Sequence, residues 1–222
     1  MLPSILDIHA HYAAGKMDGR SIISLSVGDS LQEVRWDEQG VRYSVGLHPW
    51  QVADGWEHLI EMHLRPGLDA PQVVAVGEAG LDYVRHRDRD MQSEAFVRQA
   101  LLAEQYAKPL IVHCVKAHDD LIRLHRRLTP SVPWILHGFR GKAMQATQLL
   151  REGLFLSFGE HYHAEALQIC PMDRIFIESD ESATDIRTLY QKAAQVKGLP
   201  IEEFMARVQE NVQACFSTMP KL

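Results

Sequence analysis

The stretch PLIVHCVKAHDDLIRLHRRLTPSVPWILH (109–137) contains two apolar runs with a helical segment between them. The runs occupy residues 109–113 and 133–137, and residues 118–128 have helical periodicity. Short, nearly continuous apolar runs are typical of strands that are buried on both faces of a parallel sheet. Two parallel strands need a long crossover connection, which is usually a helix. The stretch therefore predicts one strand–helix–strand unit.

The same alternation continues on both sides of this unit. Further apolar runs occupy residues 5–11, 21–27, 41–47, 73–78, 154–158 and 174–180. Further helices are expected at residues 88–107, 141–151, 183–196 and 201–214. Strand–helix alternation repeated to a count of eight predicts an α/β fold of the TIM type, a (β/α)8 barrel. Because no linker or change of composition divides the chain, we expect a single domain over residues 1–222.

The outer ring of helices is expected to be incomplete at its start. Only residues 12–20 separate the first two strands, and this connection is too short for a proper crossover helix. Residues 29–39 leave room for at most a short second helix. We therefore expect the first crossover helix to be missing or vestigial.

Composition excludes several classes of protein. The 222 residues include 23 Lys and Arg against 29 Asp and Glu, and the net charge of −6 argues against broad electrostatic binding of nucleic acid. It leaves a local basic contact open. The three cysteines, Cys114, Cys170 and Cys215, form no CxxC pair and are expected to be reduced thiols. Because the chain shows neither a signal peptide nor an apolar run of about 18 residues, we expect a cytoplasmic protein with no membrane partner.

Potential metal ligands lie at or next to the C-terminal ends of five expected strands. They are His9, His11, Glu78, His113, His137 and Asp180. In barrels of this kind the active site is built at the C-terminal rim, and the two-residue period of a strand places both histidines of the first strand on one face. Each residue alone could be an ordinary hydrogen-bonded side chain. Their coincidence at five strand ends predicts a metal centre.

Nitrogen and oxygen ligands without a thiolate suit Zn²⁺, Mn²⁺ or Mg²⁺. Six protein ligands are too many for one catalytic ion that keeps an open position, but they suffice for two divalent metal ions. Such a pair polarises a substrate oxygen and lowers the pKa of a bridging water. A carboxylate between the ions reduces their repulsion, and Glu78 is the expected bridge.

Six motifs together resemble the TatD family of metal-dependent deoxyribonucleases. They are DIHAHY (7–12), GLHPW (46–50), VGEAGLDY (76–83), PLIVHC (109–114), ILHGFRG (135–141) and DRIFIESD (173–180). The resemblance covers nearly the whole chain, from Leu6 to the C-terminal segment 199–216. It implies a two-metal hydrolase that cleaves phosphodiester bonds, with DNA as a candidate substrate.

The resemblance also implies a role for each strand-end residue. The ligands are His9, His11 and Asp180 for the first ion, His113 and His137 for the second, and Glu78 as the bridge. Glu78 and Asp180 would be the catalytic residues, and Asp180 would accept a proton from the attacking water because the metal charge keeps its carboxylate ionised.

Other residues near these motifs have a supporting or undecided role. His48 is expected to contact substrate or a ligand, and Asp82 and Tyr83 to orient the Glu78 loop. Trp50 could stack a base or pack the barrel, and the basic stretch Arg85–Arg89 could bind phosphate or form a solvated helix start. His58, His63, His118 and His125 fall in helical stretches and are expected at the surface.

The chain departs from the family pattern in its substrate-recognition elements. Family members are usually longer, and here ESATD (181–185) leads almost directly into a helix. The family's Arg just after the fifth-strand His is also absent, since His113 is followed by Cys114, Val115 and Lys116. The metal centre is thus expected to be intact while substrate recognition is reduced.

Two other functions remain open on the sequence. The same metal centre serves amidohydrolases, so the substrate could be a small molecule with a C–N or ester bond. A non-catalytic relative could keep the metals for stability. The residue at position 180 argues against this second alternative, because a structural site needs no base.

Overall fold

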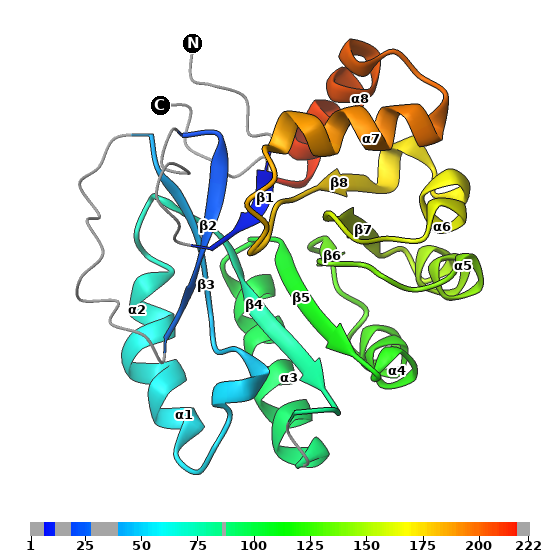
Figure 1. The fold of residues 1–222 in the computed structure, drawn as a ribbon. Coiled ribbons are helices and arrows are strands. Elements are labelled where there is room, and N and C mark those ends of the chain that lie inside the picture. Colours follow the sequence, from blue (N-terminus) through cyan, green and yellow to red (C-terminus); the bar gives the residue numbers. More distant parts are fainter. Residues whose placement is uncertain (1–6, 12–18, 28–39, 86–87, 217–222) are drawn as a thin grey trace.

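The computed structural model describes residues 7–11, 19–27, 40–85 and 88–216 (Figure 1). Eight strands form one sheet in chain order: β1 (Asp7–Ala10), β2 (Ser21–Ser26), β3 (Arg42–Gly46), β4 (Val73–Asp82), β5 (Leu110–Val115), β6 (Trp134–Leu136), β7 (Phe155–Phe158) and β8 (Ile175–Ile177). All seven neighbouring pairs are parallel. The strands curve into a nearly closed barrel, which confirms the predicted TIM-type fold.

Helices cover the outside of the barrel (Figure 1). The longer ones are α3 (Arg89–Gln105), α4 (His118–Leu128), α5 (Ala143–Arg151), α7 (Ile186–Lys197) and α8 (Ile201–Cys215), close to the predicted ranges. The sequence predicts no helix at α6 (Ala164–Ile169). Between β3 and β4, where His58 and His63 were expected in helical stretches, α1 (Trp56–Leu59), a π-helical turn (Ile60–Leu64) and α2 (Arg65–Gly67) follow one another. None of the helices in the described ranges is long and apolar enough to cross a membrane.

The predicted gap in the outer ring lies mostly outside the described residues. The connection from β1 to β2 includes residues 12–18, and the connection from β2 to β3 includes residues 28–39. The missing first crossover helix therefore stays a prediction.

Strand β4 is longer than predicted because its glycines, Gly77 and Gly80, let it approach β5 closely. All ten residues of Val73–Asp82 are buried, and pairing with β5 continues as far as Asp82 and Val115. An ideal Cβ on Gly80 would lie 1.9 Å from the carbonyl oxygen of His113. This position therefore has no room for a side chain, and the close contact brings the backbones around Glu78 and His113 together.

The first and last strands meet through a buried carboxylate. Asp7 on β1 accepts hydrogen bonds from the backbone nitrogen and the hydroxyl of Ser179, at 3.0 and 2.6 Å. Backbone bonds from Asp180 to His9 (2.9 Å) and from His11 to Asp180 (3.3 Å) extend the contact. These bonds join β1 to the segment after β8 and hold the ends of the two strands in register.

Replacing Gly80 with Ala should lower the free energy of unfolding by about 3 kcal/mol or more. The new methyl group meets backbone atoms of β5 and cannot rotate away. Gly67→Ala is the matched control, because its nearest neighbour would be a methyl group of Val45 at 3.8 Å; it should change stability by less than about 1 kcal/mol. Urea denaturation measures both, and equal stability of the two variants would contradict the close approach.

Candidate metal centre

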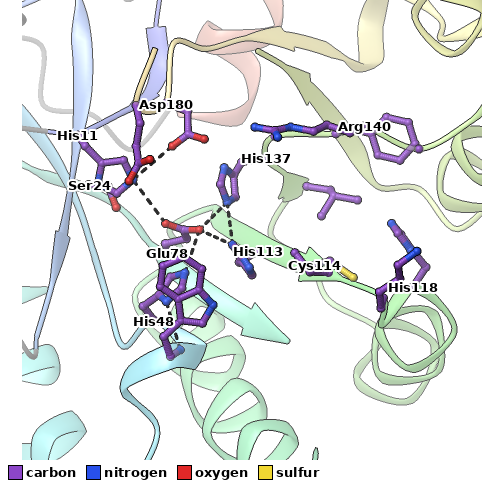
Figure 2. Close-up of a pocket in the computed structure, with 18 of the residues that line it drawn as sticks. His11, Ser24, His48, Glu78, His113, Cys114, His118, His137, Arg140 and Asp180 are labelled. Atoms are coloured by element: carbon purple, nitrogen blue, oxygen red, sulfur yellow. Dashed lines mark hydrogen bonds and ion pairs between the residues drawn. The ribbon is translucent and has the colours of Figure 1, made fainter. Parts of the chain in front are cut away.

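The structure brings all six predicted ligands together at the C-terminal side of the barrel. Figure 2 shows His11, Glu78, His113, His137 and Asp180 among the residues that line the pocket there. Glu78 lies at the centre. Its Oε1 lies 2.5 Å from Nε2 of His137 and 2.7 Å from Nδ1 of His113, and its Oε2 lies 3.5 Å from Nε2 of His9. On the side of β1, Nε2 of His11 lies 3.3 Å from Oδ1 of Asp180.

These side chains form overlapping sets that are able to hold metal. Within the described residues, ligand atoms lie within 4.8 Å of one another in four groups: His9, His11 and Asp180; His9, Glu78 and His137; His48, Glu78 and His113; and His137, Glu178 and Asp180. Three protein ligands with an open position are typical of a catalytic metal site. The overlap through Glu78 is what a bridging carboxylate requires.

The electrostatics of the cluster favour the metal-binding forms of Glu78 and His9, whereas for His137 the charge of Glu78 outweighs burial and raises the pKa well above its ordinary value. Burial alone would raise the pKa of Glu78, but the charge of His137 and hydrogen bonds with His113, His137 and His48 lower this pKa well below its ordinary value. Burial lowers the pKa of His9 to about 4, and the charge of His137 adds to this effect. A carboxylate that stays ionised and an imidazole that stays neutral are the forms that bind a metal.

Asp180 sits in a strained turn. Its φ of 51° lies in the left-handed region, which costs a non-glycine residue about 1–3 kcal/mol. The backbone bonds with His9 and His11 hold this conformation. Burial acts to raise the pKa of Asp180, but the hydrogen bond from His11 and the charge of His9 outweigh it and lower the pKa to about 2. The side chain is 26% exposed, so an ionised carboxylate faces the opening of the site.

Glu178 is a site residue that the sequence reading missed. It is fully buried, its Oε1 accepts a hydrogen bond from the backbone nitrogen of Gly138 at 2.7 Å, and the same oxygen lies 3.3 Å from Nδ1 of His137. Metal-binding histidines usually donate their second ring N–H to such a carboxylate, which fixes the ring. The sequence contains a signal for it, because Glu178 and Asp180 are two residues apart and residues at this spacing in a strand lie on the same face.

The residues after β3 and β4 form a second layer beside the cluster. Nε2 of His48 lies 3.4 Å from Glu78. Trp50 donates from Nε1 to Asp82 at 2.7 Å, and Asp82 lies 3.4 Å from Nε2 of His113. The hydroxyl of Tyr83 instead bonds to Asp120 on α4 at 2.5 Å. Of the cluster residues, Asp82 therefore contacts His113, whereas Tyr83 connects the end of β4 to α4.

A cavity of about 660 Å³ opens above the cluster. Its volume lies in the range of small-molecule sites, roughly 300–1,000 Å³. His118, which was expected at the surface, lines this cavity at the first position of α4. Arg85 and Arg89, from the basic stretch that follows β4, do not line this cavity. The guanidinium of Arg85 lies 4.0 Å from the ring centre of Trp50, and that of Arg89 lies 4.4 Å from the ring centre of Tyr83.

An eight-stranded parallel barrel with a His and carboxylate cluster at its C-terminal rim defines the class of metal-dependent hydrolases. A sequence model of the family described as TatD related DNase matches residues 7–217. The chain therefore belongs to the TatD family.

Individual relatives agree with this membership. The chain is 31% identical over 148 residues to a protein of Erwinia tasmaniensis named 3'-5' ssDNA/RNA exonuclease TatD, a match that spans 62% of this chain and 56% of that protein. It is 26% identical over 231 residues to the Erwinia amylovora protein of the same name, covering 90% of this chain and 88% of that protein. The crystal structure of YJJV, a TatD homolog from Escherichia coli K12, has the same fold, with a TM-score of 0.82, 20% identity and coverage of 98% and 99%.

Adding a divalent cation to protein freed of metal by a chelator should stabilise the fold. Zn²⁺ or Mn²⁺ at about 100 times its dissociation constant should raise Tm by about 5–10 °C. His11→Ala should reduce the shift, because it removes one ligand atom, whereas the control His58→Ala on the exposed part of α1 should not. Differential scanning fluorimetry measures the shift, and an unchanged Tm with Zn²⁺, Mn²⁺ and Mg²⁺ would exclude a metal centre.

Proposed function

We propose that this chain is a divalent-metal-dependent phosphodiesterase of the TatD type that uses two ions, Zn²⁺, Mn²⁺ or Mg²⁺, and acts as a single domain over residues 1–222. The observation that carries the proposal is the convergence of buried imidazoles on the carboxylate of Glu78, directly below an open cavity. A nucleic acid or a short phosphodiester is the proposed substrate, because the Erwinia relatives are named as exonucleases of single-stranded DNA and RNA. A cytoplasmic location remains a prediction.

The residues present fit the ions that this function needs. His9 is fully buried, yet within the described residues neither of its ring nitrogens has a hydrogen-bond partner. An unpaired buried polar atom is costly, and a metal ion would satisfy it. We assign His9, His11 and Asp180 to the first ion, His113 and His137 to the second, and Glu78 to both.

Divalent ions bound here would supply Lewis-acid polarisation of a phosphoryl oxygen and activation of water at neutral pH. The protein's own residues then place and move the proton. Asp180 is ionised and faces the cavity, so its carboxylate can accept a proton from the attacking water. Glu178 holds the ring of His137 through Nδ1 and leaves Nε2 directed at the cluster. Asp82 and Trp50 hold His113 from the other side.

The two alternatives are less well supported. Membership of the TatD family favours phosphodiester bonds over C–N or carboxylic ester bonds. The cavity above the cluster and the carboxylate exposed in it favour catalysis over a purely structural metal site, which is closed.

Glu78→Gln or Asp180→Asn should lower kcat/KM for a phosphodiester by a factor of about 100 or more. Removal of one acid–base or electrostatic element at a catalytic centre typically costs about this much. Glu165→Gln, an exposed position in the first turn of α6, is the control and should retain activity. Circular dichroism checks that the variants are folded. Wild-type activity in either folded site variant would contradict the assignment.

The short segment after β8 should limit activity on long nucleic acid. Helix α7 begins at Ile186, only a few residues after Asp180, so little chain is available to cover a substrate there. Poor positioning of a reacting group can cost about a hundredfold in rate. We expect cleavage of an activated aryl phosphodiester, and a lower kcat/KM on long single-stranded DNA than that of a relative with a longer loop, under the same metal and salt. Equal efficiency of the two proteins on long DNA would contradict this.

A further inference from the structure

The cavity above the cluster has two unlike flanks. On the β2–β3 flank the lining side chains outside the cluster carry no charge: Ser24, Ser26, Trp50 and Gln51. On the β5–β6 flank they include Lys116, His118 and Arg140. Figure 2 shows Arg140 extending from the β6 side over the cavity toward His137 and Asp180. The two permanent positive charges of the lining thus lie on one side of the candidate metal centre.

Few acidic side chains near the cavity are able to pair with these two cations. Most arginines that pair do so on the outer surface, such as Arg98 with Glu61 and Arg126 with Glu152. Within the described part of the chain, neither Lys116 nor Arg140 takes part in an ion pair, and the only acidic lining residue outside the candidate metal cluster is Glu181, which follows Asp180. Both cations therefore remain available to an anionic ligand.

The backbone holds both positions in place. Lys116 directly follows β5 and has a φ of 56°, a left-handed conformation that is uncommon for non-glycine residues. Arg140 follows Phe139, which is 2% exposed, packs edge-on against Phe158 and bonds through its backbone nitrogen to the carbonyl of Ser157 at 2.9 Å. The end of β5 thus presents Lys116, and the connection between β6 (Trp134–Leu136) and α5 (Ala143–Arg151), anchored by Phe139, presents Arg140.

We propose that Lys116 and Arg140 form a phosphate subsite that binds the phosphate next to the scissile one in an oligonucleotide. This inference rests on the proposed phosphodiesterase function and names the substrate class of the same site. A guanidinium binds phosphate through paired hydrogen bonds, and an ammonium binds it as a point charge. A phosphate bound at the metal cluster places the next phosphate of the strand to one side, and the β5–β6 flank is the cationic one.

Lys116 is the first cation in the sequence after His113, behind Cys114 and Val115. Arg140 contributes the second cation from the connection between β6 and α5. A substrate with one phosphate leaves this subsite empty, whereas a substrate with several phosphates fills it.

The first test measures binding without metal. A fluorescein-labelled tetrathymidylate is titrated with chelator-treated full-length protein at several NaCl concentrations, and fluorescence anisotropy gives Kd. Arg140→Ala should raise Kd about tenfold and reduce the slope of log Kd against log salt by about 0.7 for one lost phosphate contact. Lys116→Gln should act in the same direction.

The controls remove the same charge elsewhere. Arg127→Ala on the exposed side of α4 matches Arg140→Ala, and Lys142→Gln, outside the cavity lining, matches Lys116→Gln. Both controls should bind as the wild-type protein does. Wild-type affinity in the folded Arg140 and Lys116 variants overturns the subsite, as do equal losses in the controls or no binding by the wild-type protein.

The second test separates the subsite from the proposed function. With metal added, the ratio of kcat/KM for the tetrathymidylate to that for an activated aryl phosphodiester should fall about tenfold in Arg140→Ala, and an unchanged ratio overturns the subsite. If the wild-type protein hydrolyses neither substrate but shows the predicted pattern of binding, the phosphodiesterase function is wrong and the phosphate subsite stands.

Discussion

The central constraint of this structure is the buried carboxylate of Glu78. A carboxylate that loses its water costs several kcal/mol unless it is paired and hydrogen-bonded, and here the compensation comes from imidazoles on other strands. Because His9, His113 and His137 each come from or next to a different strand, the barrel must hold several strand ends in place at once. The absence of a side chain at Gly80 allows β4 and β5 to do so. The contacts that stabilise the barrel and the contacts that stabilise the buried carboxylate of Glu78 therefore depend on one another.

Closure of the barrel is part of the same arrangement. The last candidate ligand, Asp180, follows β8, and it is held at the site by the bonds of Ser179 to Asp7 and by its own backbone bonds with His9 and His11. A break in this contact would release a strained turn. Glu178 on the other side of Ser179 orients His137. Three consecutive residues, Glu178, Ser179 and Asp180, thus orient a ligand, close the barrel and supply the candidate base.

Much of this could be predicted from the sequence, because strands buried on both faces have a strong apolar signal and because polar residues at their ends are conspicuous. The eight strands and the meeting of the strand-end residues at Glu78 follow from that signal. The length of β4 does not, since it depends on backbone contact at Gly80 that no periodicity encodes. Helix α6 is too short for a clear helical pattern. Glu178 was overlooked because a single carboxylate in a strand has many possible partners, and only the structure shows His137 beside it.

In the proposed function, the placement of charge around the cavity offsets the overall negative charge that a polyanionic substrate would meet. The overall charge of −6 opposes approach of nucleic acid, and the segment between Asp180 and α7 is too short to form a broad cover. A local field needs neither a positive surface nor a long loop. The two cations that line the cavity, Lys116 after β5 and Arg140 between β6 and α5, act at short range, where screening by salt is weakest. In the proposed arrangement, the same rim of the barrel holds the candidate metal ligands and the cations that bind the phosphate next to the scissile one.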